Sequence, residues 1–349
     1  AAALTAAPGR TGLPVCSPAM GEFDLIERFF KRPTAVAGVN SGAVLGIGDD
    51  CALLQPTPGM QLAISSDMLV EGRHFLSTVN PAHLGHKALA VNLSDLAACG
   101  AKPLAFTLAL SLPRADAAWL EPFSRALLAL ADAHGCALVG GDTTQGPLNI
   151  CITVFGEVPP GQALLRSGAR AGDDLYVSGT LGDARLALEV FRGTLAVPGE
   201  VFSAARARME QPTPRVGLGQ ALRGVASSAI DISDGLAGDL GHILRASGVG
   251  ACIDTAVAMD LIAACRHAAV APGFSDAEKQ LEFVLAGGDD YELAFTAPAA
   301  QRAAVQTAAQ ASATPVTRIG QIEAAPGLRL VDGRGQPVSR RFASFDHFA

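Results

Sequence analysis

The segment Ala137-Leu138-Val139-Gly140-Gly141-Asp142-Thr143-Thr144 predicts how this chain is organised. A short apolar run leads into two glycines, which are followed by a carboxylate and two hydroxyls. The run predicts a buried strand, and the two glycines permit a sharp turn and the close approach of a ligand. We therefore expect Asp142 at the carboxyl end of a strand, where open α/β sheets usually bind ligands. Gly-Gly-Asp is also an ordinary turn, so acidic residues elsewhere in the chain must decide between the two readings.

The rest of the chain alternates between patterns typical of strands and patterns typical of helices, which predicts the α/β (α+β) class. Helices are expected over 22–31, 81–98, 115–134, 182–191 and 236–246. Strands are expected over 62–67, 103–112, 136–139, 148–158, 175–178, 229–232 and 291–296.

The length of 349 residues suggests about two domains. Pro159-Pro160-Gly161 is rigid, turn-forming and central, so it predicts a boundary between an N-terminal domain (20–158) and a C-terminal domain (162–349). Residues 1–19 have no basic region followed by an apolar one, and we expect them to be a disordered leader rather than a signal peptide. The segment 284–290 repeats the pattern of an apolar run before Gly-Gly-Asp, which indicates either two related halves or a shared turn chemistry.

Composition excludes several classes of protein. Apolar residues make up 49% of the chain and charged residues 17%, which is typical of packed domains. The net charge of −7 argues against nucleic-acid binding, and no apolar run reaches the roughly 20 residues of a membrane helix. The seven cysteines show no CxxC spacing, and most lie in apolar runs. We therefore expect reduced, buried thiols in a cytoplasmic protein.

Aspartates follow or interrupt many of the apolar segments, where a carboxylate is costly unless it is paired or binds a metal. The chain has only four lysines (31, 87, 102 and 279), so we expect the compensating cations to come from elsewhere. Carboxylate and hydroxyl oxygens suit Mg²⁺, which completes its shell with phosphates and water. The pattern predicts a divalent-metal nucleotide site, although helix or turn capping is expected for Asp49 and for Asp290. The aspartates in such settings are Asp49, Asp50, Asp67, Asp95, Asp142, Asp231 and Asp234.

Other sites and motifs are less favoured or stay open. The glycines of 46–50 lack the remainder of a dinucleotide fingerprint, and no Walker A loop, GxSxG elbow or HExxH motif is present. His83 and His86 share a helical face, where surface positions are favoured over a metal pair. Arg166 could clamp a phosphate or form an interdomain ion pair. Ser233 or Asp234 is expected to cap the helix that follows, which would place free N–H groups beside two carboxylates.

Taken together, nine segments resemble bacterial thiamine-monophosphate kinases, and the resemblance runs from Gly21 to the C-terminus. Met20 fits as a natural start. The wider superfamily includes aminoimidazole ribonucleotide synthetase, selenophosphate synthetase and a hydrogenase maturation protein. The matching segments are GEFDLI (21–26), GIGDDCALL (46–54), AISSDMLVEGRHF (63–75), KALAVNLSDLAACGAKP (87–103), LVGGDTT (138–144), LLRSGA (164–169), AIDISDGLAGDLGHI (229–243), LAGGDDYELAF (285–295) and FDHF (345–348).

The resemblance implies Mg²⁺-dependent transfer of the ATP γ-phosphate to thiamine monophosphate, the last step of thiamine diphosphate synthesis. It also implies a homodimer of two-domain chains, with N-terminal domains paired across a β-barrel and ATP in the cleft between domains. Asp142 and Arg166 would be catalytic. The residues implied for the Mg²⁺ shells are Asp50, Ser65, Ser66, Asp67, Asp95, Asp142, Asp231 and Asp234; those for ATP are Gly141, Asp142, Arg166 and Ser233; and those for the thiamine end are His74, Asp289 and Phe345.

The sequence departs from the family pattern at two of these positions. Asp289 stands where the family commonly has Glu, so its contact with the substrate is expected to be weaker or water-mediated. Phe345 replaces Trp or Tyr and can stack on a ligand or anchor the tail, but it cannot donate a hydrogen bond. The rival functions are an ATP-dependent cyclase or ligase of the same superfamily and an ATP-binding scaffold without turnover.

Overall fold

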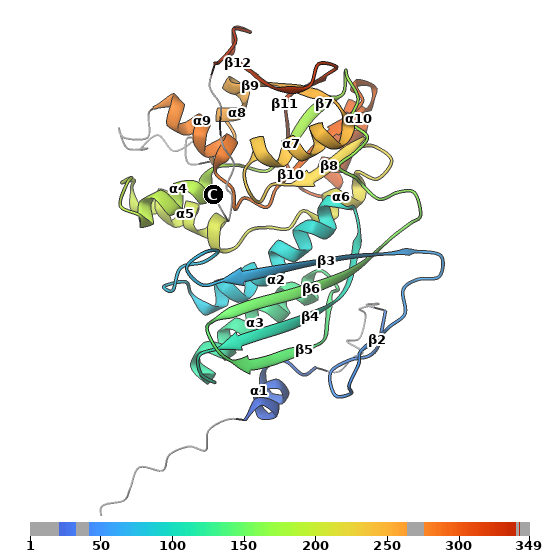
Figure 1. Ribbon diagram of the computed structural model, residues 1–349, viewed down its shortest axis with the longest axis vertical. Coiled ribbons are helices and arrows are strands. Elements are labelled where there is room, and N and C mark those ends of the chain that lie inside the picture. The colour runs from blue at the N-terminus through green and yellow to red at the C-terminus, as the bar shows by residue number, and fades with distance from the viewer. Residues whose placement is uncertain (1–20, 33–41, 264–275, 340–341, 343–349) are drawn as a thin grey trace, which may run out of the picture.

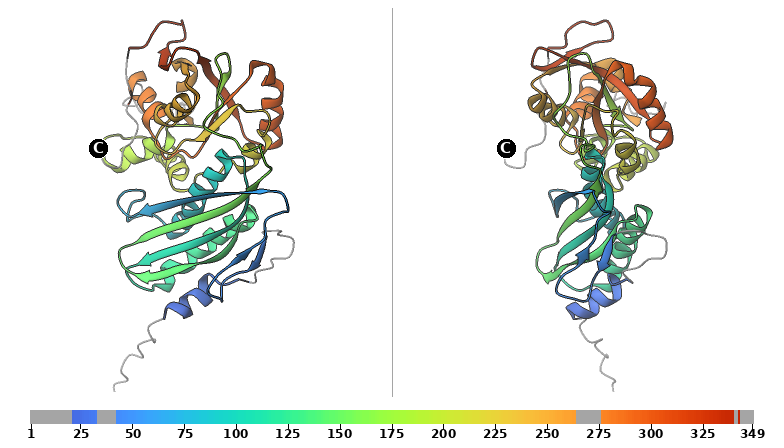
Figure 2. Two further views of the ribbon diagram at one scale, coloured as in Figure 1. Left: turned by 45° about the vertical axis from the view of Figure 1, so that its right-hand side comes forward. Right: turned by 90° about the vertical axis from the view of Figure 1, so that its right-hand side faces the viewer.

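The computed structural model describes residues 21–32, 42–263, 276–339 and 342, and these residues form a two-domain α/β fold (Figure 1). The leader 1–19 and Phe345 lie outside the described residues. Figure 2 shows the two halves stacked along the long axis of the molecule. In the described part of the chain, no helix is long and apolar enough to cross a membrane.

The first half contains a four-stranded sheet in the order β3-β6-β4-β5, whose strands lie in front of two helices in Figure 1. Alternating side chains decide which face of the sheet is covered. On β4, Leu108 and Leu110 are buried in the same core cluster as the helix residues, while Ala109 between them is exposed on the opposite, open face. The described strands of a single chain form no closed barrel. The elements are α1 (Glu22–Phe29), β1 (Ala43–Leu45), β2 (Leu53–Leu54), β3 (Gln61–Val70), α2 (Pro81–Ala98), β4 (Lys102–Leu112), α3 (Ala117–Ala133), β5 (Ala137–Gln145) and β6 (Asn149–Val158).

Helix α2 is the central element of the molecule because it packs against both halves. Asn80 caps it by accepting a hydrogen bond from the N–H of Ala82 at 2.9 Å, Pro81 occupies its first turn, and Gly100 (φ 68°) follows its end. The helix contacts β3 and β6 of the first sheet, and also α5, α6 and β8 of the second half. Burial on nearly all sides explains why its sequence is apolar around almost the whole circumference.

The second half contains a six-stranded mixed sheet in the order β12-β9-β11-β7-β10-β8. Only the β12–β9 pair is parallel. On β10, Leu293 and Phe295 belong to the core shared with the first half, while Ala294 belongs to a second core under α4, α5, α7 and α9. The elements are β7 (Asp174–Ser178), α4 (Asp183–Phe191), α5 (Gly199–Glu210), α6 (Val216–Ala221), β8 (Ser228–Asp231), α7 (Leu236–Ser247), β9 (Gly250–Asp254), α8 (Thr255–Met259), α9 (Ala277–Ala286), β10 (Leu293–Ala297), the 3-10 helix η3 (Ala299–Gln301), α10 (Arg302–Ala311), β11 (Val316–Glu323) and β12 (Gly327–Val331).

The expectation that β5 ends at the glycine pair is wrong. The strand continues to Gln145, with an irregularity in its register at Val139, between the pairs Leu138–Phe106 and Gly140–Thr107. Gly141 adopts a φ of 144°, and a Cβ atom there would lie 1.8 Å from the carbonyl oxygen of Leu108. The glycines therefore allow β5 to pair closely with β4 rather than to turn.

The apolar run before the second Gly-Gly-Asp belongs to a helix. It is the end of helix α9, which begins after Asp276, whose side chain accepts a hydrogen bond from the N–H of Glu278 at 2.9 Å. A short apolar run has no clear periodicity, so the cap was the more informative signal. The first Gly-Gly-Asp segment thus lies inside a strand and the second follows a helix, so the similarity does not extend to a repeated strand.

Candidate functional site

Four aspartates from both halves of the chain converge on one cavity of about 270 Å³. Asp67 lies on β3 and Asp95 on α2, while Asp231 ends β8 and Asp234 lies in the loop between β8 and α7. The neighbouring wall of the cavity contains Ser233, His74 and Asp289. Asp67 and Asp95 are more than 130 residues before Asp231 and Asp234 in the chain, yet all four line a single junction between the two domains.

Burial raises the pKa values of three carboxyls in this cluster, and neighbouring carboxylates add to the shift of two of them. Burial, together with the charges of Asp95 and Asp234, raises the pKa of Asp67 to about 6. Burial, with the charge of Asp95 as the next cause, raises the pKa of Asp231 to about 8, although Ser94 donates a hydrogen bond to it at 2.8 Å. Burial also raises the pKa of Asp95, against a hydrogen bond from Ser65 and the charge of Arg166. Without a bound cation, the site therefore favours the protonated, neutral form of these carboxyls.

The donor set of this cluster fits Mg²⁺. Within the described residues, no lysine or arginine forms an ion pair with any of the four aspartates. Among the same residues, no three His, Cys, Asp or Glu side chains are already arranged around a single ion. Mg²⁺ usually takes one or two carboxylates and completes its shell with phosphates and water. The cluster thus suits ions that a phosphate ligand also coordinates.

The loop before α7 is capped differently from the sequence-based expectation. Asp239, inside the helix, accepts hydrogen bonds from the backbone N–H groups of Ser233 (3.1 Å), Asp234 (3.0 Å) and Gly235 (3.1 Å). Gly235 is the N-cap residue and no side chain caps from that position. The expectation that Ser233 or Asp234 caps the helix is therefore wrong, and these three N–H groups are not free for a phosphate. Both residues instead line the cavity.

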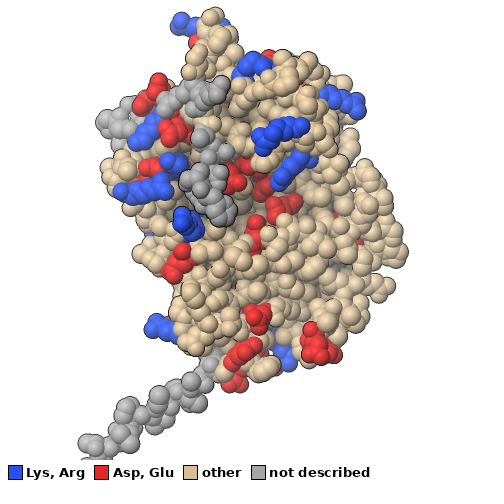
Figure 3. All heavy atoms as spheres, in the orientation of Figure 1, with Lys and Arg blue, Asp and Glu red and all other residues tan. Residues whose placement is uncertain are grey.

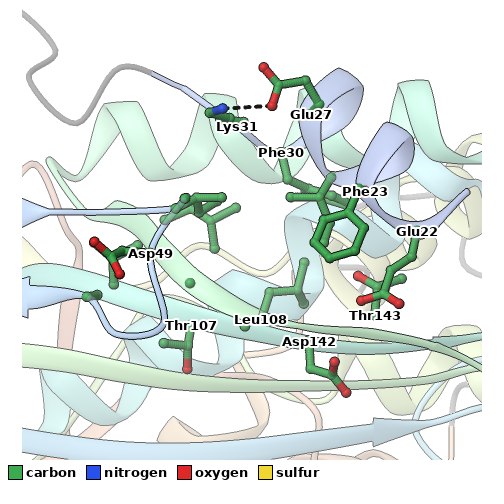
Figure 4. A pocket seen from close by; sticks show the side chains of 18 of the residues that line it. Glu22, Phe23, Glu27, Phe30, Lys31, Asp49, Thr107, Leu108, Asp142 and Thr143 are labelled. Carbon is green, nitrogen blue, oxygen red and sulfur yellow. Dashed lines mark hydrogen bonds and ion pairs between the residues drawn. The ribbon is translucent and has the colours of Figure 1, made fainter.

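The remaining predicted metal ligands form a second group in the first half. Gly141, Asp142 and Asp50 line a larger cavity of about 670 Å³ between α1, the loop 47–52 and β5. Figure 4 shows Asp142 on the strand that forms one wall of this cavity and Phe23 of α1 on the opposite wall. In the sheet order, β5 is separated from β3 by β6 and β4. At about 4.8 Å per strand, Asp142 is roughly 14 Å from Asp67, too far to share an ion within one chain.

The two predicted serine ligands lie on opposite faces of β3. The hydroxyl of Ser65 donates to Oδ2 of Asp95 at 2.5 Å and belongs to the acidic cluster. The hydroxyl of Ser66 contacts that of Thr153 at 3.0 Å and donates to the carbonyl oxygen of Ile152 at 3.1 Å. This difference follows from the alternation of side chains along a strand. Ser66 therefore lies on the open face of the sheet, beside Thr153 of β6.

Several other predictions have a definite outcome. His83 and His86 are half-buried rather than free on the surface, and they contact Oε2 of Glu210 (2.7 Å) and the carbonyl oxygen of Pro212 (2.8 Å) in the second half. Asp290 accepts hydrogen bonds from the N–H of Gly182 (3.0 and 3.3 Å), the residue directly before α4, which agrees with the capping role expected of it.

Arg166 and the cysteines also differ in part from expectation. Arg166 forms no ion pair with a described residue, and its positive charge lowers the pKa of Asp95. The five described cysteines are free thiols. Only Cys136 among them is buried, so the expectation of mostly buried thiols is wrong for this part of the chain.

Sequence reasoning missed two residues at this site. Asp239 was not considered because nothing in its local pattern distinguishes it from other acidic helix residues. Lys87 was assumed to lie away from the acidic groups, but its ammonium nitrogen is 2.6 Å from Oδ2 of Asp289. The available signal was a lysine in a helix whose other residues are mostly apolar.

The fold and this site define the class of protein. Residues 48–158 match the family model "AIR synthase related protein, N-terminal domain", and residues 170–333 match "AIR synthase related protein, C-terminal domain". The chain is thus a two-domain member of the AIR synthase related proteins.

Comparison with individual relatives specifies the family further. The thiamine-monophosphate kinase of Escherichia coli (strain K12) is 47% identical over 333 residues, which cover 95% of this chain and 99% of the relative. The crystal structure of thiamine-monophosphate kinase from Stenotrophomonas maltophilia K279a is 45% identical with a TM-score of 0.76, covering 85% of this chain and 92% of that chain. AaThiL complexed with AMPPCP and TMP is 29% identical with a TM-score of 0.69, covering 84% and 89%. The chain belongs to the thiamine-monophosphate kinase family.

Proposed function

We propose that this chain transfers the γ-phosphate of ATP to thiamine monophosphate, with Mg²⁺, and releases thiamine diphosphate and ADP. The observation that carries the proposal is the acidic cluster of Asp67, Asp95, Asp231 and Asp234, which lies at the junction of the two domains and forms no ion pair with a lysine or arginine among the described residues. Support for the substrates comes from the AaThiL relative, which is complexed with AMPPCP and TMP. ATP is assigned to the junction between domains, beside Arg166 and Ser233.

Phosphoryl transfer requires mainly positioning and charge neutralisation from the protein. Bound to the four aspartates, Mg²⁺ would neutralise the repulsion between the two phosphate groups. The acceptor oxygen is already ionised near neutral pH, because the second pKa of a phosphate monoester is about 6. The chain therefore needs no general base. The guanidinium of Arg166 would bind ATP phosphates, and His74 and Asp289 would hold the thiamine end, so that transfer is direct and in line, without a phosphoenzyme.

The proposal includes a homodimer, and the open face of the first sheet is the surface that favours it. Leu62, Ile64 and Met68 of β3 are large apolar residues that are 47%, 60% and 53% exposed on this face. Figure 3 looks onto the same face and shows it almost free of charged side chains. Two such faces, packed together, would close the paired sheets into a β-barrel and remove this apolar surface from water.

Dimerisation also accounts for the separation of the two groups of predicted ligands. Asp142 pairs in register with Ala109, which is exposed on the open face, and Ser66 lies on the same face. In a face-to-face dimer, Asp142 and Gly141 of one copy would approach Ser66 of the other, whereas Asp67 points to the opposite, helix-covered face of β3. Each complete site would then contain residues of two chains, with Asp50 entering from the loop beside Asp142.

Two further assignments belong to the same proposal. The domain boundary is placed at residues 159–161, because β6 ends at Val158 and the N–H of Gln162 closes a turn onto the carbonyl oxygen of Pro159 at 3.0 Å. Free thiols at all five described cysteines favour a cytoplasmic location.

The deciding experiment is to incubate the protein with Mg-ATP and thiamine monophosphate and to quantify thiamine diphosphate and ADP. Equal amounts of the two products are expected, and free thiamine should not serve as an acceptor. ADP formed only with a ribonucleotide amide would favour a cyclase or ligase of the same superfamily. Nucleotide binding without any turnover would favour a scaffold, and either result would refute the kinase assignment.

A further inference from the structure

Lys87 is a buried cation at the edge of the candidate site. It lies on α2 of the first half, and the residue is only 2% exposed. Its ammonium nitrogen is 2.6 Å from Oδ2 of Asp289 in the second half and donates to the carbonyl oxygen of His74 at 3.3 Å. Lysine is almost never buried to this extent unless it is paired. Lys87 therefore bridges the two described residues that are assigned to the thiamine end of the substrate.

The backbone that carries Asp289 is strained, which shows that its position is held by its surroundings. Asp289 has a φ of 62° and Tyr291 a φ of 51°, both in the left-handed region that favours glycine. The N–H of Asp289 donates to the carbonyl oxygen of Ser233 at 2.7 Å, and that of Tyr291 donates to Ile232 at 2.8 Å. A left-handed conformation is unfavourable for a residue with a side chain. Strain of this kind persists only where other contacts fix the conformation, and it is concentrated at functional sites.

The ion pair fixes one side of the Asp289 carboxylate and leaves the residue accessible to a ligand. The side chain of Lys87 is 3% exposed, whereas that of Asp289 is 34% exposed and lines the same cavity as His74 and the acidic cluster. A carboxylate anchored to a buried ammonium group loses little further conformational freedom when it accepts a hydrogen bond from a ligand. The pair also joins the two domains, so the position of Asp289 depends on a residue of the opposite domain.

We infer that Lys87 is a positioning residue for the acceptor substrate. It acts through Asp289 and through the backbone of His74, without contacting the transferred phosphate. The inference rests on the proposed function, which assigns Asp289 and His74 to thiamine monophosphate. It predicts that Lys87 determines the affinity for thiamine monophosphate and has little influence on the affinity for ATP.

The test compares steady-state kinetics of Lys87→Met, Asp289→Asn and the double variant, with each substrate varied in turn. Methionine fills a similar volume without the charge, so the fold is expected to persist. Loss of a charged hydrogen bond should raise the KM for thiamine monophosphate roughly tenfold or more in K87M, with the KM for ATP and kcat changed much less. The double variant should be no worse than D289N, because both changes remove one interaction.

A matched control is Lys102→Met, which removes the pair between Lys102 and Glu157 (3.1 Å) on the first sheet and should leave both KM values near those of the parent. The inference is overturned if K87M leaves the KM for thiamine monophosphate unchanged, if both KM values rise equally, or if the effects of the two single variants multiply in the double variant. Should K87M fail to fold, Lys87→Arg keeps a cation but displaces it, and an unchanged KM in that variant is equally contradictory.

Measuring the activity of the parent enzyme distinguishes a failure of this inference from a failure of the proposed function. If the parent makes no thiamine diphosphate, the proposed function fails before any variant is measured. If the parent is active and the variants behave as stated in the overturning outcomes, only the role of Lys87 fails.

Discussion

Replacing Asp231 with asparagine is predicted to stabilise the metal-free protein while abolishing its turnover. Burial and the charge of Asp95 raise the pKa of Asp231 to about 8 in the folded state, compared with the ordinary value of 3.8. Near neutral pH, the Asp231 carboxyl is ionised in the unfolded chain. Folding must therefore either protonate the carboxyl or bury its charge, and both reduce the stability of the folded protein. The amide of asparagine has the same shape, can still accept the hydrogen bond from Ser94, and has no charge to bury.

The size of the effect follows from the difference between the two pKa values. One pKa unit corresponds to 1.36 kcal/mol, so the interval from 3.8 to neutral pH limits the gain in the free energy of unfolding of D231N to about 4 kcal/mol. Relaxation and water penetration reduce penalties of this kind, so we expect a gain of about 2 kcal/mol. Because a carboxyl pKa raised in the folded state favours the protonated form, the parent loses stability as the pH rises from about 4 to about 8. The difference between variant and parent should therefore be larger at pH 8 than at pH 6.

The assay is thermal unfolding of parent and D231N at both pH values, with EDTA and with Mg²⁺ plus a non-hydrolysable ATP analogue. The variant should melt a few degrees higher with EDTA, and the metal and nucleotide should stabilise only the parent strongly. Asp174→Asn is a control of opposite sign. Hydrogen bonds from Arg302, and then from Arg318, lower the pKa of Asp174, so its contribution is present above the ordinary value of 3.8 and is lost as the pH falls below it. Two results would refute this reasoning. One is a melting temperature of D231N below that of the parent with EDTA at pH 8. The other is an increase in melting temperature with Mg²⁺ and nucleotide that is as large for D231N as for the parent.

Three further variants test other parts of the account. Asp142→Asn should nearly abolish turnover, and an unchanged rate at saturating Mg²⁺ would remove Asp142 from the metal site. Arg166→Ala should mainly raise the KM for ATP, roughly tenfold if one charged hydrogen bond is lost; a rise confined to the KM for thiamine monophosphate would contradict the assignment. Ile64→Arg places a charge on the apolar open face and should yield an inactive protein that is monomeric when measured by light scattering. An active dimer would exclude this face as the interface.

Local patterns were sufficient to predict much of the fold. The helix over 81–98 was predicted with its bounds, because an N-cap, a proline in the first turn and a following glycine all agree there. The acidic residues at 67, 95, 231 and 234 were identified because each interrupts or follows an apolar segment, and the resemblance to a known family supplied their common purpose. The structure brings these four aspartates together as expected.

The errors concern features that are set by partners far apart in the chain. The end of β5 could not be predicted, because the glycines are required by the approach of Leu108 on the neighbouring strand. The sheet order, which separates Asp142 from Asp67, has no local signature either. The pair between Lys87 and Asp289 joins residues 202 positions apart across a domain junction. Such contacts become visible only when the two domains are placed together.

The central claim is that aspartates distant in the sequence hold divalent ions against the phosphates of ATP. The most direct measurement is a crystal structure with Mn²⁺ in place of Mg²⁺ and a non-hydrolysable ATP analogue, in which anomalous scattering locates the ions. The account predicts anomalous peaks between the phosphate oxygens and the carboxylates of Asp67, Asp95, Asp231 and Asp234. Nucleotide bound elsewhere, or phosphates at this junction with no ion between them and these carboxylates, would contradict it.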